Sequence, residues 1–351
     1  MAILTHTIQI APRIDSIVTT SSRPTLAALG EFGLISRIAA RVAPQDNVIT
    51  GIGDDAAVTA LTPGMRLLTS TDMLLENVHF RRTWHDPYTL GRKSLAVSVS
   101  DIAAMGGIPR WALLSIAIPS DLPLDFIDDF MRGFLEFAAE YRVTLIGGDT
   151  CSSRCGVTIS VTIMGEQFPD LIVRRSGAQP DDDIWVTGTL GDAALSLDLL
   201  ENRKTASDLL LTRLLNPTPR VSMALALAEA ELATAMIDVS DGIRADFGHI
   251  AETSGVGGTI RITDLPLSDL FRSLTAHLPD ISCHHALSGG EDYEICFTAC
   301  RSNREKIVDC AKKCGIAVTR IGIVTKFSGV TILNRDGSEF TARADGFNHF
   351  T

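Results

Sequence analysis

Strand-like and helix-like segments alternate along this sequence in two blocks, and a polar segment rich in Gly, Pro and charge separates the blocks. That segment is RRSGAQPDDD, residues 174–183. A chain of 351 residues is too long for one ordinary core and long enough for two α/β domains. We therefore expect a flexible leader over residues 1–29, an N-terminal domain over 30–170 and a C-terminal α/β domain over 171–351.

Hydrophobic periodicity places the individual elements. In the first block it predicts helices over 30–42, 86–105 and 126–141, and strands near 48–52, 56–60, 66–70, 111–119, 143–150 and 156–166. Asp86 and Pro87 supply an N-cap and a first-turn proline for the second helix. In the second block we expect strands within 184–187, 233–242, 257–263, 316–324 and 329–334, and helices within 188–200, 206–215, 219–233, 243–254 and 302–314, with a loop after residue 263.

Charge and composition exclude several classes of function. The formal net charge of −11 argues against a nucleic-acid partner, which would need clustered Lys and Arg. No apolar run approaches the ~20 residues that a membrane-spanning helix needs, so no membrane association is expected. The seven cysteines are odd in number and scattered, which favours free thiols in a reducing cytoplasm over disulfides or a zinc site.

The most distinctive chemical feature is a set of acidic residues, each beside Gly, Ser or Thr at the end of an apolar run. They occur in GIGDDAAV (51–58), STD (70–72), SDIAAMGG (100–107), GGDT (147–150), IDVSDG (237–242) and SGGEDYE (288–294). Singly, each acid is an ordinary turn former or N-cap. Together they indicate carboxylates that converge on Mg²⁺ and substrate phosphates, because unpaired carboxylates repel one another unless cations compensate. This pattern indicates phosphoryl transfer.

Common nucleotide-binding signatures are missing. The sequence contains neither a GxxxxGK[ST] loop nor the combined HRD and DFG set of protein kinases, because HRD is missing. TGTLGD (187–192) is Gly-rich at a strand-to-helix turn, but a simple turn explains it equally well.

A specific resemblance emerges when the motifs are read in order. They are GEFGLISRI, GIGDDAAV, STDMLLENVHF, LAVSVSDIAAMGGIP, LIGGDT, RRSGA, IDVSDG, SGGEDYE and DGFNHF, and they span the chain from about residue 30 to its end. The sequence resembles the thiamine-monophosphate kinase family, which shares its fold with aminoimidazole ribonucleotide synthetase, selenophosphate synthetase and a hydrogenase-maturation protein. NVHF, SGGEDYE and GFNHF favour the thiamine member. Selenophosphate synthetase would be expected to have a reactive cysteine near its start, whereas the first cysteine here is Cys151.

The resemblance implies a fold and an activity. The fold would be α/β (α+β), a two-domain aminoimidazole ribonucleotide synthetase-like arrangement of mixed sheets packed with helices. The N-terminal domain would bind ATP and Mg²⁺ and form a homodimer by joining sheets across the interface. The activity would be ATP-dependent phosphorylation of thiamine monophosphate to thiamine diphosphate by direct in-line transfer.

The resemblance also implies roles for individual residues. Metal ligands would be Asp55, Ser70, Thr71, Asp72, Asp101, Asp149, Asp238 and Asp241. Of these, Asp72, Asp101 and Asp149 would be the most sensitive catalytic positions. ATP would contact Gly148, Asp149, Arg175 and Ser240, with Arg174 as an alternative to Arg175. Thiamine monophosphate would contact His79, Glu291 and Phe347. Asp54 and Asp292 adjoin proposed ligands in the sequence and would not contact metal or substrate themselves. Glu76 and Asn77 depart from the family pattern and affect only local loop shape.

Three alternatives remain open from the sequence. The first is another ATP-using member of the same superfamily. The second is a metal-dependent phosphatase phosphorylated on Asp238, although Asp238 and Asp241 are three residues apart and haloacid-type phosphatases use DxD spacing. The third is a sensor that binds metal or nucleotide without turnover.

Overall fold

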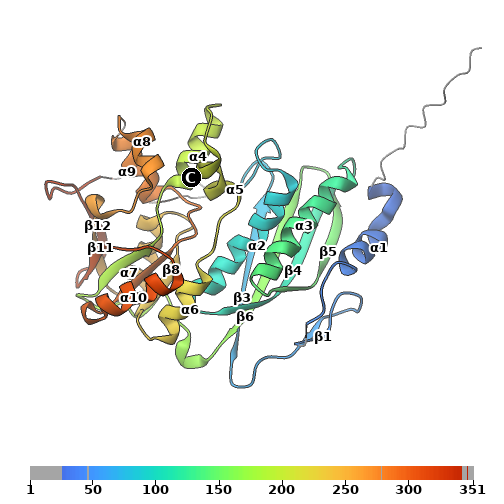
Figure 1. The fold of residues 1–351 in the computed structure, drawn as a ribbon, viewed down its shortest axis with the longest axis horizontal. Helices are drawn as coiled ribbons and strands as arrows, with labels where there is room; N and C mark the ends of the chain where they lie inside the picture. Colours follow the sequence, from blue (N-terminus) through green and yellow to red (C-terminus); the bar gives the residue numbers. More distant parts are fainter. Residues whose placement is uncertain (1–25, 46, 278, 342–345, 347–351) are drawn as a thin grey trace, which may run out of the picture.

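The computed structural model describes residues 26–341 and 346, apart from 46 and 278. Two mixed β-sheets, each packed with helices, lie beside each other (Figure 1). The expected fold class is therefore confirmed. Most of residues 1–29, the predicted leader, lies outside the described residues, as does Phe347.

The N-terminal half carries a four-stranded sheet in the order β3-β6-β4-β5. The strands are β3 (Arg66–Leu75), β4 (Ile108–Pro119), β5 (Thr144–Ser153) and β6 (Thr158–Gln167). β6 pairs antiparallel with β3 and β4, and β4 pairs parallel with β5. A separate two-stranded sheet joins β1 (Val48–Thr50) to β2 (Val58–Thr59). β3 and β5 extend beyond the predicted ends at residues 70 and 150, so Thr71 and Asp72 lie inside β3 and not after it.

Three helices accompany this sheet: α1 (Leu26–Ala39), α2 (Pro87–Ala104) and α3 (Leu124–Glu140). α1 begins before the predicted helix and is interrupted at Gly30, whose φ of 69° is not helical. α2 begins as predicted, because the Asp86 carboxylate accepts a hydrogen bond from the Thr89 backbone N–H and Pro87 occupies the first turn. α2 and α3 cover one face of the sheet (Figure 1), and the phenylalanines of α3 fill the core between them.

The other face of the four-stranded sheet is open. Side chains of a strand alternate between the two faces. In β3, Leu68 and Leu74 are buried under the helices, whereas Leu67 and Met73 are 49% and 55% exposed. Ser70 and Asp72 share the parity of Leu68 and therefore lie on the helix-covered face. Thr71 lies on the open face.

The C-terminal half carries a six-stranded sheet in the order β12-β9-β11-β7-β10-β8, antiparallel except for β12 with β9. Its strands are β7 (Asp183–Thr187), β8 (Ala235–Asp238), β9 (Gly257–Arg261), β10 (Ile295–Ala299), β11 (Val318–Thr325) and β12 (Gly329–Leu333). Its helices are α4 (Asp192–Glu201), α5 (Asp208–Leu215), α6 (Val221–Glu229), α7 (Ile243–Ser254), α8 (Asp269–Thr275), α9 (Pro279–Ser288) and α10 (Arg304–Cys314).

Both faces of this sheet are buried. Ile184 and Val186 of β7 pack into one core with residues of α7 and α9, and Trp185 packs into a second core with residues of α6 and α10. Ala103 and Ala104, at the end of α2, belong to the second core as well. α2 therefore packs into both halves of the molecule.

The segment after β9 differs from the prediction of a loop, because it contains α8 and α9. Ser268 caps α8 by accepting a hydrogen bond from the Phe271 backbone N–H at 3.0 Å. At seven residues, α8 is too short for periodicity to reveal it.

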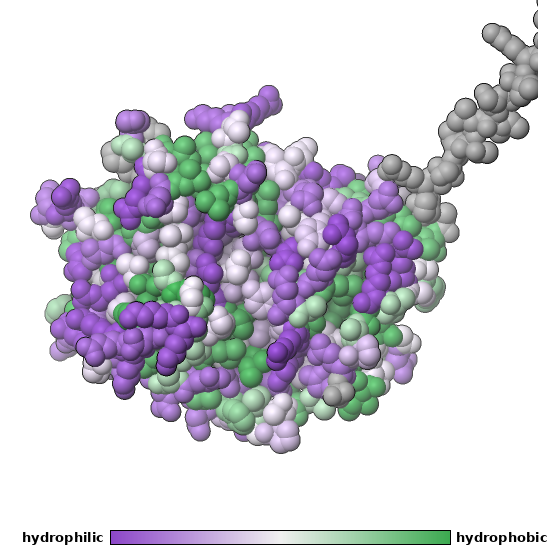
Figure 2. Space-filling model, in the orientation of Figure 1, coloured by the Kyte–Doolittle hydropathy of each residue, from purple (hydrophilic) through white to green (hydrophobic). Residues whose placement is uncertain are grey.

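No described helix is both long and apolar enough to cross a membrane. The face drawn in Figure 2 mixes hydrophilic and hydrophobic residues across both halves.

Candidate active site

Three carboxylates converge where the two halves meet. Asp72 comes from β3, Asp101 from α2 and Asp238 from the end of β8. Asp238 is 3% exposed. Each carboxylate influences the ionisation of another, so they share one electrostatic environment. Tertiary structure thus brings together three acids that are far apart in the sequence.

The ionisation of these acids is strongly perturbed. Burial, followed by the nearby Asp101 charge, raises the pKa of Asp72 to about 6. The same two effects raise the pKa of Asp238 to about 7, and burial also raises the pKa of Asp101. Carboxyls in such surroundings resist losing their protons until a cation offsets the charge. Perturbed acids of this kind gather at functional sites.

Hydroxyl groups hold two of these acids in place. Ser70 Oγ donates to Asp101 Oδ2, and Ser100 Oγ donates to Asp238 Oδ2 at 2.8 Å. The Oδ2 atom of Asp72 is buried and has no hydrogen-bond partner among the described residues. An orphaned carboxylate oxygen beside two further carboxylates suits a hard cation such as Mg²⁺, which prefers oxygen ligands.

The acids do not form a finished metal cage. Among the residues that the structure describes, no three His, Cys, Asp or Glu side chains lie close enough together to hold one metal ion. Mg²⁺ commonly keeps several waters and takes further ligands from substrate phosphates. The donor set therefore fits a cation that is bound together with a phosphorylated ligand.

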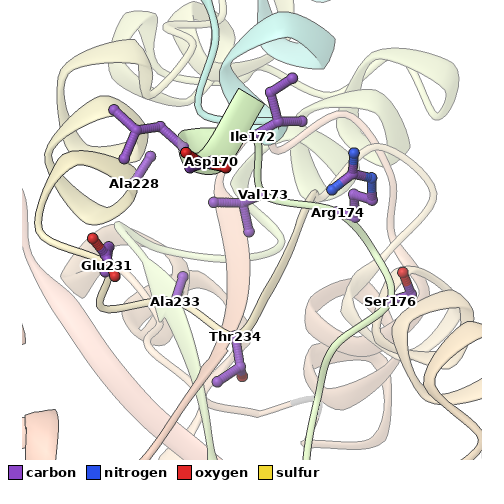
Figure 3. A pocket seen from close by; sticks show the side chains of 10 residues that line it. Asp170, Ile172, Val173, Arg174, Ser176, Ala228, Glu231, Ala233 and Thr234 are labelled. Carbon is purple, nitrogen blue, oxygen red and sulfur yellow. The ribbon is translucent and has the colours of Figure 1, made fainter. Parts of the chain in front are cut away.

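The neighbouring arginines face different surroundings. The Arg175 guanidinium lowers the pKa of Asp101 and of Asp238, so it lies near the acidic cluster. Arg174 instead lines a cavity of about 370 Å³ with Asp170 and Glu231 (Figure 3), and none of the three clustered acids lines that cavity. Of these two arginines, Arg175 is therefore the one whose charge acts on the acidic cluster.

Replacing Arg175 by alanine is expected to raise KM for ATP about tenfold or more, because one charge-assisted contact to a phosphate is lost. Arg174→Ala is the matched control and should change that KM by less than about twofold. Steady-state kinetics with varied ATP measures both. Equal effects of the two substitutions would contradict the assignment of Arg175.

Asp246 is a structural support that the sequence did not reveal. This buried residue of α7 accepts hydrogen bonds on Oδ2 from the backbone N–H groups of Ser240, Asp241 and Gly242, at 3.0 to 3.1 Å. Burial, with the charges of Asp238 and Asp241, raises its pKa to about 8. Asp246 therefore fixes the loop that follows Asp238. The position of Asp246 in the first turn of the helix that follows IDVSDG could have indicated that it binds backbone N–H groups there.

Other predicted ligands lie apart from the cluster. Asp55 is in an exposed loop, where its backbone N–H donates to Asp54 Oδ1 at 2.8 Å. Asp149 is exposed on β5 opposite Ser115 of β4, on the open face of the sheet. Thr71 shares that face and hydrogen-bonds to Thr162. Three strand spacings, about 14 Å, separate β3 from β5. Within one chain Asp149 and Thr71 are therefore on the opposite face from Asp72.

Gly148 has a packing reason that the sequence did not indicate. Its φ is 153°, and a Cβ there would overlap the carbonyl oxygen of Leu114 on the adjacent strand. Close approach of β4 thus requires glycine at this position, whatever ligand binds nearby.

The residues predicted to contact the second substrate lie on two segments. His79 follows β3, and its Nδ1 accepts a hydrogen bond from the Leu75 backbone N–H at 3.0 Å. Glu291 belongs to the segment before β10 and is paired with Lys93 of α2. Tyr293 is a buried residue near Glu291 and the acidic cluster. Its pKa is raised by burial and by the charges of Glu291, Asp72, Asp238 and Asp101. Neither Lys93 nor Tyr293 was among the predicted site residues.

Asp292 supports the fold next to the site. It is buried, and its carboxylate accepts from the Gly191 backbone N–H at 2.9 and 3.1 Å. Burial raises its pKa to about 8. The Gly-rich TGTLGD turn is thus anchored to the segment that carries Glu291.

Two family models match the chain: the N-terminal domain of AIR synthase related proteins over residues 53–167, and the C-terminal domain of these proteins over residues 179–333. Together with the two mixed sheets, these matches define the class as AIR synthase related proteins.

Similar proteins narrow the class further. The thiamine-monophosphate kinase of Escherichia coli K12 is 38% identical over 330 residues, which cover 92% of this chain and 99% of that protein. The crystal structure of thiamine-monophosphate kinase from Stenotrophomonas maltophilia K279a is 40% identical, with a TM-score of 0.79 over 88% of this chain and 96% of that one. A structure of AaThiL complexed with AMPPCP and TMP is 32% identical, with a TM-score of 0.73 over 95% of this chain and 100% of that one. The chain belongs to the thiamine-monophosphate kinase family.

Proposed function

We propose that this protein transfers the γ-phosphate of ATP to thiamine monophosphate, forming thiamine diphosphate and ADP. One observation carries the proposal: the half-buried carboxylates of Asp72 and Asp101 and the buried carboxylate of Asp238 converge beside Arg175. The 38% identical E. coli relative is named a thiamine-monophosphate kinase, and the similar AaThiL structure contains AMPPCP and TMP.

In this proposal Asp72, Asp101 and Asp238 would bind Mg²⁺ ions jointly with the ATP phosphates and water, and no single ion would need all three carboxylates. When bound, Mg²⁺ neutralises phosphate charge and helps to orient the phosphates. Ser70 and Ser100 keep two of the carboxylates in position, and Asp246 holds the loop with Ser240 and Asp241 next to them. Asp241 and Ser240 therefore remain proposed metal and ATP contacts.

The transfer itself needs no strong base. The second pKa of a phosphate monoester is about 6, so the acceptor oxygen is largely ionised at neutral pH. We propose that this oxygen attacks the γ-phosphorus in line, forming one P–O bond while the bond to the β-phosphate oxygen breaks and ADP leaves. Arg175 contributes positive charge beside the phosphates. On the acceptor side we retain His79, Glu291 and Phe347 as proposed contacts.

We propose that the working form is a homodimer in which a second copy covers the open face of the N-terminal sheet. Leu67 and Met73 are exposed apolar side chains on that face, which supports an interface there. In such a dimer Thr71 and Asp149 lie at the contact between copies, which gives them a location consistent with a shared role.

The proposed compartment is the cytoplasm, where ATP is available. Six cysteines form no disulfide with one another, which supports a reducing environment; they are Cys151, Cys155, Cys296, Cys300, Cys310 and Cys314.

The function is tested with purified protein, ATP, Mg²⁺ and thiamine monophosphate. We expect thiamine diphosphate and ADP in equal amounts, identified by chromatography and mass spectrometry. Thiamine is the control, and it should not be phosphorylated because it lacks the acceptor phosphate. ADP release that depends on a different phosphorylated acceptor would instead favour another member of the superfamily.

The phosphatase alternative is disfavoured by the surroundings of Asp238. This residue is 3% exposed and its pKa is raised by burial, so it is poorly placed to attack phosphorus as an ionised nucleophile. Acid quenching with labelled ATP should leave no phosphate on the protein, and labelled protein would favour the phosphatase.

A further inference from the structure

Lys93 is a buried cation that joins the two halves of the molecule. It belongs to α2 in the N-terminal half and is 0% exposed. Its ammonium donates to the carbonyl oxygen of Leu214 at 2.9 Å and to Oε2 of Glu291 at 2.6 Å, both in the C-terminal half. A buried ammonium costs much free energy unless it is paired and hydrogen-bonded, and these two contacts meet that need.

Glu291 is held in an unusual conformation by its backbone as well. Its φ is 69°, in the left-handed region that non-glycine residues seldom adopt, and its N–H donates to the carbonyl oxygen of Ser240 at 2.8 Å. Strained residues of this kind gather at ligand-binding positions. Glu291 is thereby attached to the loop beside the acidic cluster.

Only one of the two carboxylate oxygens of Glu291 accepts a hydrogen bond from a described residue. Lys93 occupies Oε2, whereas no described residue donates a hydrogen bond to Oε1. The side chain is 27% exposed. Lys93 therefore sets the orientation of the carboxylate while leaving one oxygen available to a ligand.

Two of the polar contacts that α2 makes with the C-terminal half lie at the proposed site. Ser100, which donates to Asp238, is seven residues after Lys93, so both residues lie on the same face of the helix. Seven residues correspond to about 10.5 Å along a helix at a rise of 1.5 Å per residue. One contact is at the acidic cluster and the other is at Glu291.

We propose that Lys93 is a positioning residue for the phosphate acceptor, which holds the Glu291 carboxylate so that its free oxygen accepts a hydrogen bond from an N–H group of that substrate. This inference rests on the proposed function and on the proposed contact of Glu291 with the acceptor. Lys93 acts through Glu291 and does not touch the reacting phosphates. Its loss should therefore affect the acceptor far more than ATP.

The test is Lys93→Met, which keeps the length of the side chain and removes its charge. We expect KM for thiamine monophosphate to rise about tenfold or more, and KM for ATP to change by less than about twofold. Combined with Glu291→Gln, it should add little further loss, because both substitutions disrupt the same contact. Arg304→Met is the matched control. It removes a partner from the buried carboxylate of Asp183 far from the site and should leave both KM values unchanged.

Other results separate the inference from the function. One such result is that the wild-type protein makes thiamine diphosphate while Lys93→Met leaves KM for the acceptor unchanged or raises both KM values equally. That result would refute the positioning role of Lys93 and leave the proposed function intact. A wild-type protein that does not phosphorylate thiamine monophosphate would overturn both ideas. Should Lys93→Met not fold, Lys93→Arg makes the same test, because the larger guanidinium keeps the charge but moves the carboxylate.

Discussion

Asp101→Asn is expected to lower kcat about 10³-fold while the protein stays folded. Asp101 belongs to the acidic cluster, where its charge raises the pKa of Asp72 and Asp238, and its negative charge would be needed to bind Mg²⁺ during phosphoryl transfer. Asparagine keeps the shape and the ability to accept from Ser70, so the loss reflects charge. Single-turnover measurements at saturating ATP, Mg²⁺ and acceptor give the size of the effect.

The same substitution should stabilise the protein when metal is absent, because it removes repulsion among buried carboxylates. Urea unfolding in the presence of EDTA measures this gain. Asp129→Asn is the control, because it removes an exposed carboxylate of α3 that forms an ion pair with Arg132 on the surface. For this variant kcat should change by less than about twofold. A kcat for Asp101→Asn within tenfold of the wild-type value would exclude Asp101 from the catalytic cluster.

Without divalent metal, the free energy of unfolding is expected to fall by several kcal/mol between pH 5 and pH 8. The pKa values of Asp72, Asp238, Asp246 and Asp292 are raised to about 6, 7, 8 and 8, whereas an unfolded Asp has a pKa of about 3.9. The folded state therefore binds more protons than the unfolded state in this range. The stability that these protons give is complete below about pH 4 and is lost as pH rises through the folded pKa values.

Carboxyl groups whose pKa is lowered by folding affect stability in a lower pH range. Burial alone would raise the pKa of Glu294, Asp183 and Glu166, but arginine partners lower the pKa of the first two, and hydrogen bonds from Thr62, together with Arg110, lower that of Glu166. Their contribution to stability is therefore lost only as pH falls below about 4. Urea unfolding at pH 5, 6.5 and 8 in EDTA isolates the predicted slope. Mg²⁺ should restore more stability at pH 8 than at pH 5, and NaCl of equal ionic strength controls for screening. Stability that rises from pH 5 to pH 8 in EDTA would be inconsistent with these raised pKa values.

Several features followed from local sequence rules. The start of α2 was predicted from Asp86 and Pro87, because capping depends only on neighbouring residues. Of the acids predicted to converge, Asp72, Asp101 and Asp238 act on one another's ionisation, whereas Asp149 is on the opposite face of the sheet. By contrast, the face of the sheet that Thr71 and Asp149 occupy depends on strand pairing, which the sequence pattern does not give, and the strand predicted near 66–70 ended before Thr71.

Long-range pairs escaped prediction for a different reason. Lys93 reads as an ordinary helix residue, because its partner Glu291 is 198 residues away in the sequence. Asp246 supports a loop through backbone N–H groups that carry no sequence signal. The contact between Lys93 and Glu291 exists only after both halves have folded against each other, so residue type and spacing cannot reveal it.

The shared position of α2 has a consequence for how the chain holds together. Its apolar residues fill the N-terminal core, while Ala103 and Ala104 complete a core of the C-terminal half. Separating the N-terminal half from the C-terminal half would leave a gap in the C-terminal core and would expose the apolar end of α2 on the N-terminal half. Although two family models divide the chain, its halves should melt together as one cooperative unit.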